Sequence, residues 1–212
     1  MKDFQNVTLK DEKSIFLGEN VTIGKNVTIY ENNRVEGNTT LGDGCVLLPN
    51  NYIKDCKIGD NVTVHQSVLE DSEVGDGVQI GPFARLRPRS VIKKGAKIGN
   101  FVEIKNATVG ENTKVSHLAY VGDAVLGDGC NVGCGAIFVN YNGRTKSRTV
   151  VGDNCFIGSN CNVVAPVTIA DNCYICAGTT VTDDIPQDGF VIGRSRQEIK
   201  PDRAHNYLKE KK

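Results

Sequence analysis

Aliphatic residues recur in this chain about every six positions, a spacing that suits neither an amphipathic helix nor an alternating strand. The repeated unit is an aliphatic residue, usually followed by Gly, then two turn-forming residues, and a small or β-branched residue four places after the first. It begins at Ile23, Leu41, Ile58, Val74, Ile98, Val109, Leu126, Val151 and Ile157. So many units mark an internal repeat, and the repeat decides the architecture before any single element is considered.

A six-residue repeat of this kind predicts an all-β solenoid shaped like a three-sided prism. Each unit forms a short strand and a corner, and three units complete a coil of about 18 residues. The aliphatic residue and the small residue four places later point inward, while Gly and Asn supply the backbone angles of the corners. Stacked coils then pair strand to strand at about 4.8 Å. The period slips between Ile53 and Ile58 and between Ile104 and Val109, which we interpret as adjusted corners.

The repeat divides the chain into three parts. Residues 1–14 form a lead-in, residues 15–185 form the β-helix with roughly nine or ten coils, and residues 186–212 form a polar C-terminal arm that is partly helical. Inside the β-helix, residues 138–149 break the pattern, and a solenoid accommodates such an insertion by extruding it as a loop. Because extruded loops commonly build binding sites, this segment is a candidate.

Composition narrows the classes of function. Lys and Arg number 25 and Asp and Glu also number 25, so the chain has no net charge to attract nucleic acid or an anionic membrane. Aromatic residues make up 6% with no Trp, too few for a base-stacking surface, and 23 glycines suit turns better than a helical bundle. The sequence shows neither an apolar run of about 18 residues nor a secretory signal, so we expect a cytoplasmic protein.

The cysteines and histidines do not predict metal or redox chemistry. Five cysteines occupy the small inward slot and are expected to be buried thiols, namely Cys45, Cys130, Cys155, Cys161 and Cys173. Cys173 and Cys176 spell a CxxC, but they occupy different positions in the repeat, and zinc or redox chemistry needs both sulfur atoms at one point. The three histidines, His65, His117 and His205, are too dispersed for a three-histidine zinc site.

Residues 18 positions apart are predicted to stack on adjacent coils. Arg87 and Lys105 form one such pair, and two unpaired cations about 5 Å apart repel unless an anion such as a phosphate monoester lies between them. A solvated charge ladder with neighbours such as Glu103 is the alternative. Ser159 and Ala177 stack in the same way and leave a shallow groove for a slender chain, although both are equally well ordinary small residues of the repeat.

His117 lies one coil beyond the two stacked cations. A neutral imidazole near an amine acts as a general base near neutral pH. A lone histidine is more often structural, so the spacing alone leaves both interpretations of His117 open.

Several segments of the chain closely resemble one family. They are residues 80–88, 99–105, 117–123, 131–135, 139–146 and 164–167. Together they are similar to the acetyltransferase half of the bifunctional bacterial enzyme glucosamine-1-phosphate acetyltransferase/N-acetylglucosamine-1-phosphate uridylyltransferase. The similarity covers nearly the whole chain and is most specific from residue 80 to residue 196. No Gly-rich nucleotide loop precedes residue 15, so we expect the uridylyltransferase activity to be absent.

The resemblance implies a left-handed parallel β-helix and a homotrimer with active sites between subunits. It also implies that His117 is the catalytic base and that Asn140 helps to position the reacting groups. The residues that hold the sugar phosphate would be Arg87, Lys105, Tyr120, Asn131 and Lys146. Acetyl-coenzyme A would contact Asn140, Tyr141, Ser159, Ala177 and Arg194.

The reaction implied by the family is the direct N-acetylation of glucosamine 1-phosphate in the UDP-N-acetylglucosamine pathway, without an acyl-enzyme and without a metal. Three positions depart from the family pattern. Asn142 stands where the family usually has Asp, Arg89 where Gly often follows Arg-Pro, and Ser116 where Gly often precedes His. These changes could alter loop order or rate, but none removes a chemical group that the mechanism needs.

Two other functions remain as alternatives. Another hexapeptide acyltransferase, acting on a hydroxyl group or an amino acid, would leave the Arg87 and Lys105 pair without a purpose. A non-catalytic β-helical assembly module would neither bind coenzyme A nor release a thiol from it.

Overall fold

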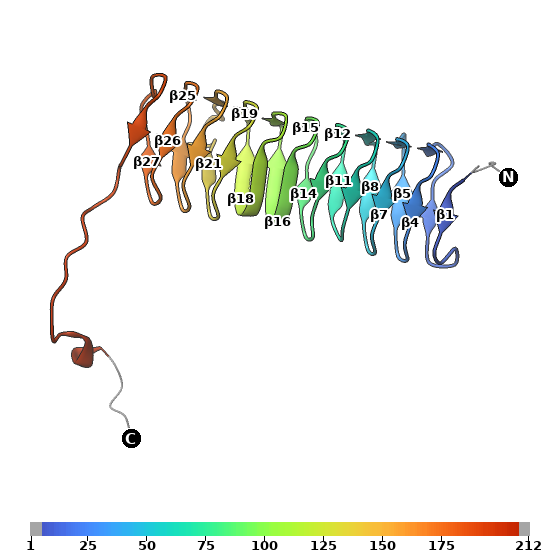
Figure 1. Ribbon diagram of the computed structural model, residues 1–212, viewed down its shortest axis with the longest axis horizontal. Helices are drawn as coiled ribbons and strands as arrows, with labels where there is room; N and C mark the ends of the chain where they lie inside the picture. The colour runs from blue at the N-terminus through green and yellow to red at the C-terminus, as the bar shows by residue number, and fades with distance from the viewer. Residues whose placement is uncertain (1–5, 208–212) are drawn as a thin grey trace.

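The computed structural model describes residues 6–207 and is built from short parallel strands. Figure 1 shows the strands as a row of similar coils that runs from β1 (Thr8–Leu9) to the C-terminal strands, followed by a tail that leads away from the last coil. The predicted all-β solenoid is confirmed, and its strands fall into a 19-stranded and a nine-stranded sheet.

Three columns of strands form the three faces of the prism. The first face holds β1, β4 (Thr28–Ile29), β7 (Val46–Leu47), β10 (Thr63–Val64), β13 (Gln79–Ile80), the beginnings of β16 (Lys97–Lys105) and β18 (Lys114–Gly122), β20 (Asn131–Val132), β23 (Phe156–Ile157), β26 (Tyr174–Ile175) and β28 (Phe190–Val191). The second face holds β2 (Phe16–Leu17), β5 (Arg34–Glu36), β8 (Tyr52–Lys54), β11 (Val68–Glu70), β14 (Arg85–Leu86), the ends of β16 and β18, β21 (Ile137–Val139), β24 (Asn162–Val164) and β27 (Thr180–Val181). The third face holds β3 (Thr22–Ile23), β6 (Thr40–Leu41), β9 (Lys57–Ile58), β12 (Ser72–Val74), β15 (Ser90–Ile92), β17 (Thr108–Val109), β19 (Ala124–Leu126), β22 (Thr149–Val151) and β25 (Val167–Ile169).

The register between coils follows the repeat. Residues one coil apart are offset by 18 positions at Leu86↔Ile104 and by 17 at Leu41↔Ile58 and Ile92↔Val109, where the period slips in the sequence. The offset rises to 25 at Asn131↔Phe156, because the inserted loop lies within that coil. The strands β16 and β18 each continue through a corner and so join the first two faces into one sheet.

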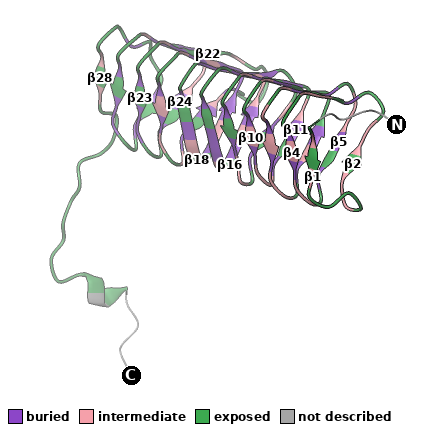
Figure 2. Cartoon of the chain, turned by 45° about the vertical axis from the view of Figure 1, so that its right-hand side comes forward, coloured by how far each residue is buried: buried purple, intermediate pink, exposed green. Residues whose placement is uncertain are grey.

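The interior of the prism is filled by the aliphatic and small residues of the repeat, as the buried positions in Figure 2 show. The five cysteines predicted in the small inward slot are all buried, as is Cys56, and all eight cysteines are free thiols. Burial raises the pKa of Cys56 to about 11 and that of Cys155 to about 12. These thiols therefore stay protonated at neutral pH and serve as small hydrophobic side chains.

The glycine that follows each aliphatic residue has a different role from the one predicted. Gly42 is not among the residues with positive φ, but a Cβ added to it would collide with the backbone of Gly59 in the next coil. The left-handed corner conformation falls two places later, with φ of 68° at Gly44 and 55° at Asn61. The first glycine therefore allows the coils to approach closely, and only the later Gly or Asn supplies the corner angle.

Aspartates at one corner tie successive coils together. The Oδ1 atom of Asp43 accepts the backbone N–H of Lys25 at 2.7 Å, Asp60 accepts that of Asp43 at 2.7 Å, and Asp76 accepts that of Asp60 at 2.8 Å. The pattern resumes with the carboxylates of Asp128, Asp153 and Asp171. This aspartate ladder satisfies corner N–H groups that the strands leave without a partner.

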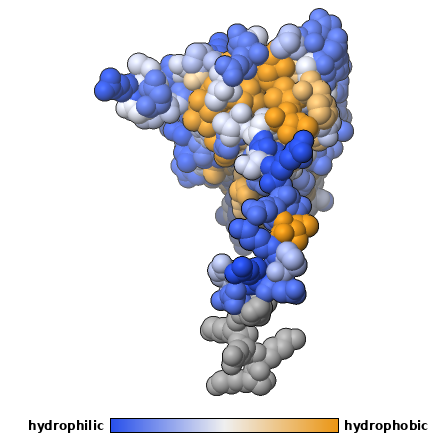
Figure 3. Space-filling model, turned by 90° about the vertical axis from the view of Figure 1, so that its left-hand side faces the viewer, coloured by the Kyte–Doolittle hydropathy of each residue, from blue (hydrophilic) through white to orange (hydrophobic). Residues whose placement is uncertain are grey.

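The solenoid extends beyond the predicted residues 15–185 at both ends. Strand β1 of the predicted lead-in pairs with β4, and β28 of the predicted arm pairs with β26, whereas residues 1–5 lie outside the described part. The arm contains one 3-10 turn, η1 (Ala204–Asn206). Figure 3 looks at the C-terminal end, where hydrophobic side chains gather on the end of the prism above the descending arm. Within the described residues no helix is long and apolar enough to span a membrane.

We predict that Asp60→Ala lowers the free energy of unfolding by about 1 kcal/mol, because the N–H of Asp43 loses its charged acceptor at an exposed corner. The measurement is the urea midpoint followed by circular dichroism. Asp60→Asn is the matched control, since it keeps an amide oxygen in place and should lose less. Equal midpoints for all three proteins would show that the ladder contributes nothing to stability.

Candidate functional site

The two predicted cations lie on adjacent coils of the second face. The register Leu86↔Ile104 places Arg87 beside Lys105, and the N–H of Arg87 donates to the carbonyl oxygen of Ile104 at 2.8 Å. Each cation has a carboxylate partner, so the two are not unpaired. Arg87 Nη1 lies 2.9 Å from Glu103 Oε1, and Lys105 Nζ lies 3.9 Å from Asp123 Oδ2.

Lys146 of the inserted loop completes a cluster of three cations and two carboxylates. The Lys146 ammonium and partial burial lower the pKa of Lys105, against the opposing effect of Asp123. The hydrogen bond that Arg87 donates to the Glu103 carboxylate raises the pKa of Arg87. The cluster thus keeps one positive charge in excess, and crowding of the ammonium groups favours the binding of an anion.

The inserted loop is ordered by its own hydrogen bonds. Phe138 is fully buried in β21 and Thr149 is buried in β22, so the part that leaves the solenoid is narrower than the predicted 138–149 and covers residues 140–148. The Asn142 Oδ1 atom accepts the N–H of Thr145 at 2.8 Å, and Tyr141 forms an antiparallel bridge with Lys146. Asn142 therefore provides the acceptor oxygen that an Asp would provide in this turn.

His117 is exposed at the corner between the first and second faces. It pairs with Asn100 of the preceding coil, and its Nδ1 atom lies 2.7 Å from the Asn100 side-chain oxygen. An amide oxygen only accepts hydrogen bonds, so the ring carries its proton on Nδ1. The Nε2 atom is left with the lone pair that a general base needs.

The same corner continues from His117 through a column of small residues. Val115, Val132, Ile157 and Ile175 are in register on successive coils, and the residues two places after each of them are His117, Cys134, Ser159 and Ala177. At about 4.8 Å per coil, the column extends about 14 Å from the imidazole. Arg194 closes its far end, donating from Nη1 to the Ala177 carbonyl oxygen at 2.8 Å.

A hollow of about 420 Å³ on the second face is lined by Phe101, Glu103, Leu118, Ala119, Tyr120, Gly135 and Ile137. Its lining includes Glu103, the partner of Arg87, and Leu118, which follows His117 in the chain, but neither the cations nor the imidazole. A side chain on Gly122 would collide with the Tyr120 ring, so the glycine lets this ring lie flat against the coil. The hollow has room for a monosaccharide.

Not every predicted site residue joins this arrangement directly. Asn131 lies on the first face, in register with Lys114 and Phe156. Arg89, one of the departures, has φ of 65°, which explains why a glycine suits that position. Ser116 brings its carbonyl oxygen against Gly99, which therefore has no space for a side chain.

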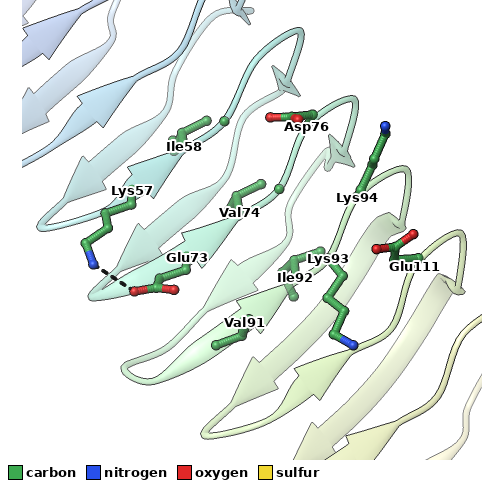
Figure 4. Close-up of a pocket in the computed structure, with 12 residues that line it drawn as sticks. Lys57, Ile58, Glu73, Val74, Asp76, Val91, Ile92, Lys93, Lys94 and Glu111 are labelled. Atoms are coloured by element: carbon green, nitrogen blue, oxygen red, sulfur yellow. Dashed lines mark hydrogen bonds and ion pairs between the residues drawn. The ribbon is translucent and has the colours of Figure 1, made fainter.

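A second hollow, of about 480 Å³, opens on the third face near the place where Lys94 interrupts the aspartate ladder (Figure 4). It contains none of the predicted site residues. Two of its charged residues pair with each other, Lys57 Nζ lying 2.9 Å from Glu73 Oε1. In the part of the chain that the structure describes, no three His, Cys, Asp or Glu side chains gather to hold a metal ion.

Three residues of the site were missed in the sequence: Asn100, Asp123 and Cys134. Glu103 was expected beside the two cations in the charge-ladder alternative, and it pairs with Arg87. Asn100 and Asp123 lie within the segments that carry the resemblance, but their partners are 17 residues away and only the register connects them. Cys134 lies two places after inward Val132, the same signal that singled out Ser159. It was overlooked because the inserted loop makes their spacing 25 instead of 18.

Three family models match parts of the chain. They are "Bacterial transferase hexapeptide (six repeats)" over residues 148–183, "Hexapeptide repeat of succinyl-transferase" over residues 14–53, and "GMPPB C-terminal domain" over residues 68–141. Two of them are hexapeptide repeats, and they agree with the strand and corner pattern of the model. The predicted left-handed parallel β-helix is thereby confirmed.

Curated relatives match nearly the whole chain. The Bifunctional protein GlmU of Exiguobacterium sibiricum is 47% identical over 198 residues, which are 93% of this chain and 44% of the relative. That of Clostridium acetobutylicum is 49% identical over 193 residues, which are 91% of this chain and 42% of the relative. The chain therefore spans less than half the length of the relatives it matches.

Solved structures share the fold at lower identity. LpxA of Bacteroides fragilis, described as a UDP-N-acetylglucosamine acyltransferase, is 20% identical with a TM-score of 0.61, covering 85% of this chain and 70% of its own. A putative acetyltransferase of Bacillus cereus is 20% identical with a TM-score of 0.51, covering 57% and 77%. These structures show the fold alone, whereas the curated relatives confirm the resemblance seen in the sequence: this chain corresponds to one part of the bifunctional GlmU proteins.

Proposed function

We propose that this chain is an acetyl-coenzyme A-dependent N-acetyltransferase that converts glucosamine 1-phosphate to N-acetylglucosamine 1-phosphate. The observation that carries the proposal is the cluster of the Arg87, Lys105 and Lys146 cations on the second face, with the His117 imidazole exposed at the adjoining corner of the next coil. Glucosamine 1-phosphate carries its phosphate and its amine on neighbouring ring carbons, so its site needs cations and a base together.

The cation cluster would bind the phosphate and orient the sugar. Three cations against two carboxylates leave a charge that complements the phosphate, and Tyr120 lines the hollow next to Glu103. Because these groups would contact the phosphate and not the reacting amine, their contribution is to binding and orientation more than to the chemical step. Asn131 is included on the family resemblance, and its place on the first face makes it the least supported member.

His117 would act as the general base in a direct transfer. Nε2 takes a proton from the neutral 2-amino group as its nitrogen attacks the thioester carbonyl carbon. The C–S bond of the tetrahedral intermediate then breaks, and the sulfur takes the proton from Nε2, so that coenzyme A leaves as the thiol and the imidazole is neutral again. Asn100 holds the imidazole in the required tautomer through its 2.7 Å contact with Nδ1. A backbone N–H would stabilise the oxyanion, and Asn140 would position the reacting groups.

The acyl donor would lie along the small-residue column. Ser159 and Ala177 leave space for the slender pantetheine chain, and Arg194 at the end of the column offers a cation to the phosphates of coenzyme A. Tyr141 and Asn140 are at the start of the inserted loop, on the coil next to Ser159. Neither a metal nor a cysteine takes part in the proposed reaction.

We also propose a homotrimer. An apolar patch lies at the hollow and is formed by four exposed side chains: Phe83 (48% exposed), Phe101 (57%), Leu118 (58%) and Ile137 (37%). The rings of Phe83 and Phe101 are stacked, with their centroids 5.3 Å apart. An exposed apolar patch beside a site is typical of a protein interface. A second copy packed there would also complete an open active site. The placement in the cytoplasm and in the UDP-N-acetylglucosamine pathway is proposed on the same resemblance.

A free-thiol release assay with acetyl-coenzyme A tests the function directly. We expect rapid release with glucosamine 1-phosphate and far slower release with unphosphorylated glucosamine. Comparable rates with a hydroxyl or amino acid acceptor would favour the alternative acyltransferase. No release with any acceptor, together with no binding of acetyl-coenzyme A by calorimetry, would favour the assembly module.

We predict that His117→Ala lowers kcat by about 10²- to 10⁴-fold, because general-base catalysis contributes this much. Steady-state kinetics provide the measurement, with the native molecular mass unchanged. His65→Ala is the control, since His65 is not part of the site and should retain full activity. Turnover by His117→Ala close to that of the wild type would refute its role as base.

We predict that Arg87→Ala raises KM for glucosamine 1-phosphate by about 10- to 100-fold with a smaller effect on kcat, as expected for the loss of a charge-assisted contact. Arg85→Ala is the control matched in charge, because Arg85 lies on β14 two residues before Arg87 and pairs with Glu70 at 3.5 Å. It should leave KM near the wild-type value. An unchanged KM in Arg87→Ala would remove Arg87 from the phosphate site.

We predict that Leu118→Asp lowers the native molecular mass from three chains to one, because a carboxylate would be buried without a partner in the proposed interface. Sedimentation equilibrium measures the mass. Thr180→Asp, on the same face but outside the patch, should remain trimeric. A monomeric wild-type protein would contradict the proposal.

A further inference from the structure

Asp123 occupies a buried corner between the cation cluster and the inserted loop. It is 9% exposed, and its φ of 48° turns the chain sharply after β18. Asp123 lies in a column with Arg89 and Asn106 of the two preceding coils. The backbone N–H of each of these three residues donates to a carbonyl oxygen of the coil before it. A charged side chain in such a place needs partners for both oxygens.

Both carboxylate oxygens of Asp123 have amide partners. The Asn106 side-chain NH₂ donates to Oδ1, and the Asn140 side-chain NH₂ donates to Oδ2. Lys105 Nζ lies 3.9 Å from Oδ2. One carboxylate therefore contacts a cation of the cluster and the residue at which the inserted loop begins.

Only an ionised carboxylate fits this set of partners. It accepts hydrogen bonds at both oxygens, whereas an amide at residue 123 would turn one NH₂ group toward another. Burial alone would raise the pKa of Asp123, but the amides of Asn106 and Asn140 and the Lys105 ammonium outweigh burial and hold the pKa below its usual value. Asp123 is therefore charged throughout the neutral pH range.

The chain of contacts extends to Arg89, one of the departures from the family. Arg89 Nε donates to Asn106 Oδ1 at 3.0 Å. This bond fixes the orientation of the Asn106 amide, so that its NH₂ group faces Asp123. In the series Arg89, Asn106, Asp123 and Asn140, it is thereby fixed which side chain donates and which accepts each hydrogen bond.

We propose that Asp123 is a positioning residue of the acetyl transfer, which fixes the side-chain amide of Asn140 with its NH₂ group inward and its carbonyl oxygen left as a free acceptor. An amide held in this orientation can accept a hydrogen bond from the attacking amine. Asp123 also ties the base of the inserted loop to the cation cluster, because it binds the side chain of Asn140, whose backbone carbonyl oxygen accepts the N–H of Ser147 at 2.9 Å. The inference rests on the proposed function.

The test compares Asp123→Asn with the double variant Asn106→Asp/Asp123→Asn in the full chain. The single change places two NH₂ groups face to face, and we expect kcat at saturating substrates to fall at least tenfold. The double variant reverses donor and acceptor between residues 106 and 123 and restores the bond to Asn140. We expect its kcat to return to within about threefold of the wild type.

Asp71→Asn is the matched control, because Asp71 occupies the same corner one coil before Arg89, with φ of 43°. It should leave kcat unchanged. A purely structural role of Asp123 would lower the melting temperature without changing kcat of the folded protein, and that result would overturn the inference. So would a double variant as slow as the single one.

Failure of the inference is distinguishable from failure of the proposed function. Wild-type activity together with an unchanged Asp123→Asn variant overturns the inference alone. A wild-type chain that transfers no acetyl group to glucosamine 1-phosphate overturns both.

Discussion

The hydrogen-bonded register between successive coils is the constraint on which the rest of this structure depends. Parallel pairing at about 4.8 Å converts a difference of one coil in sequence into direct contact in space. Arg87 meets Lys105 in this way, and His117 meets Asn100. The register is held where the coils approach most closely, at glycines without room for a side chain and at aspartates that bond the corner of the preceding coil. The site is thus a consequence of the repeat.

Two carboxylates then offset the repulsion between the cations that the register places side by side. Adjacent cations alone would repel, and the structure places Glu103 and Asp123 among them, leaving an excess of one charge. The two carboxylates reduce the repulsion among the three cations and still leave a positive charge that suits the anion of the proposed substrate. Asp123 matters most, because its oxygens also fix the amides of Asn106 and Asn140. The cation cluster and the loop are connected through this one buried carboxylate.

The corner conformations decide which residues face the solvent beside the site. Phe101 and Leu118 have φ of 57° and 40°, and this turn in the long strands β16 and β18 exposes their apolar side chains. Bulky residues in the left-handed region are uncommon and need support from their surroundings. Here the support is the pairing of β16 with β18 on both sides of the corner. The exposure of the apolar patch and that of the His117 imidazole both result from this left-handed corner in β16 and β18.

The sequence by itself determined the repeat, the β-helix, the buried cysteines, the inserted loop and the stacking of Arg87 on Lys105, because inward positions and coil spacing follow from a period that can be counted. It did not determine Asp123 as the carboxylate partner of Lys105, the tautomer of His117, or the place of Cys134 in the small-residue column. Those depend on local offsets of 16 to 25 residues and on side-chain directions at the corners. Only the tertiary structure decided them, since a single corner adjusted by one residue changes which side chains meet.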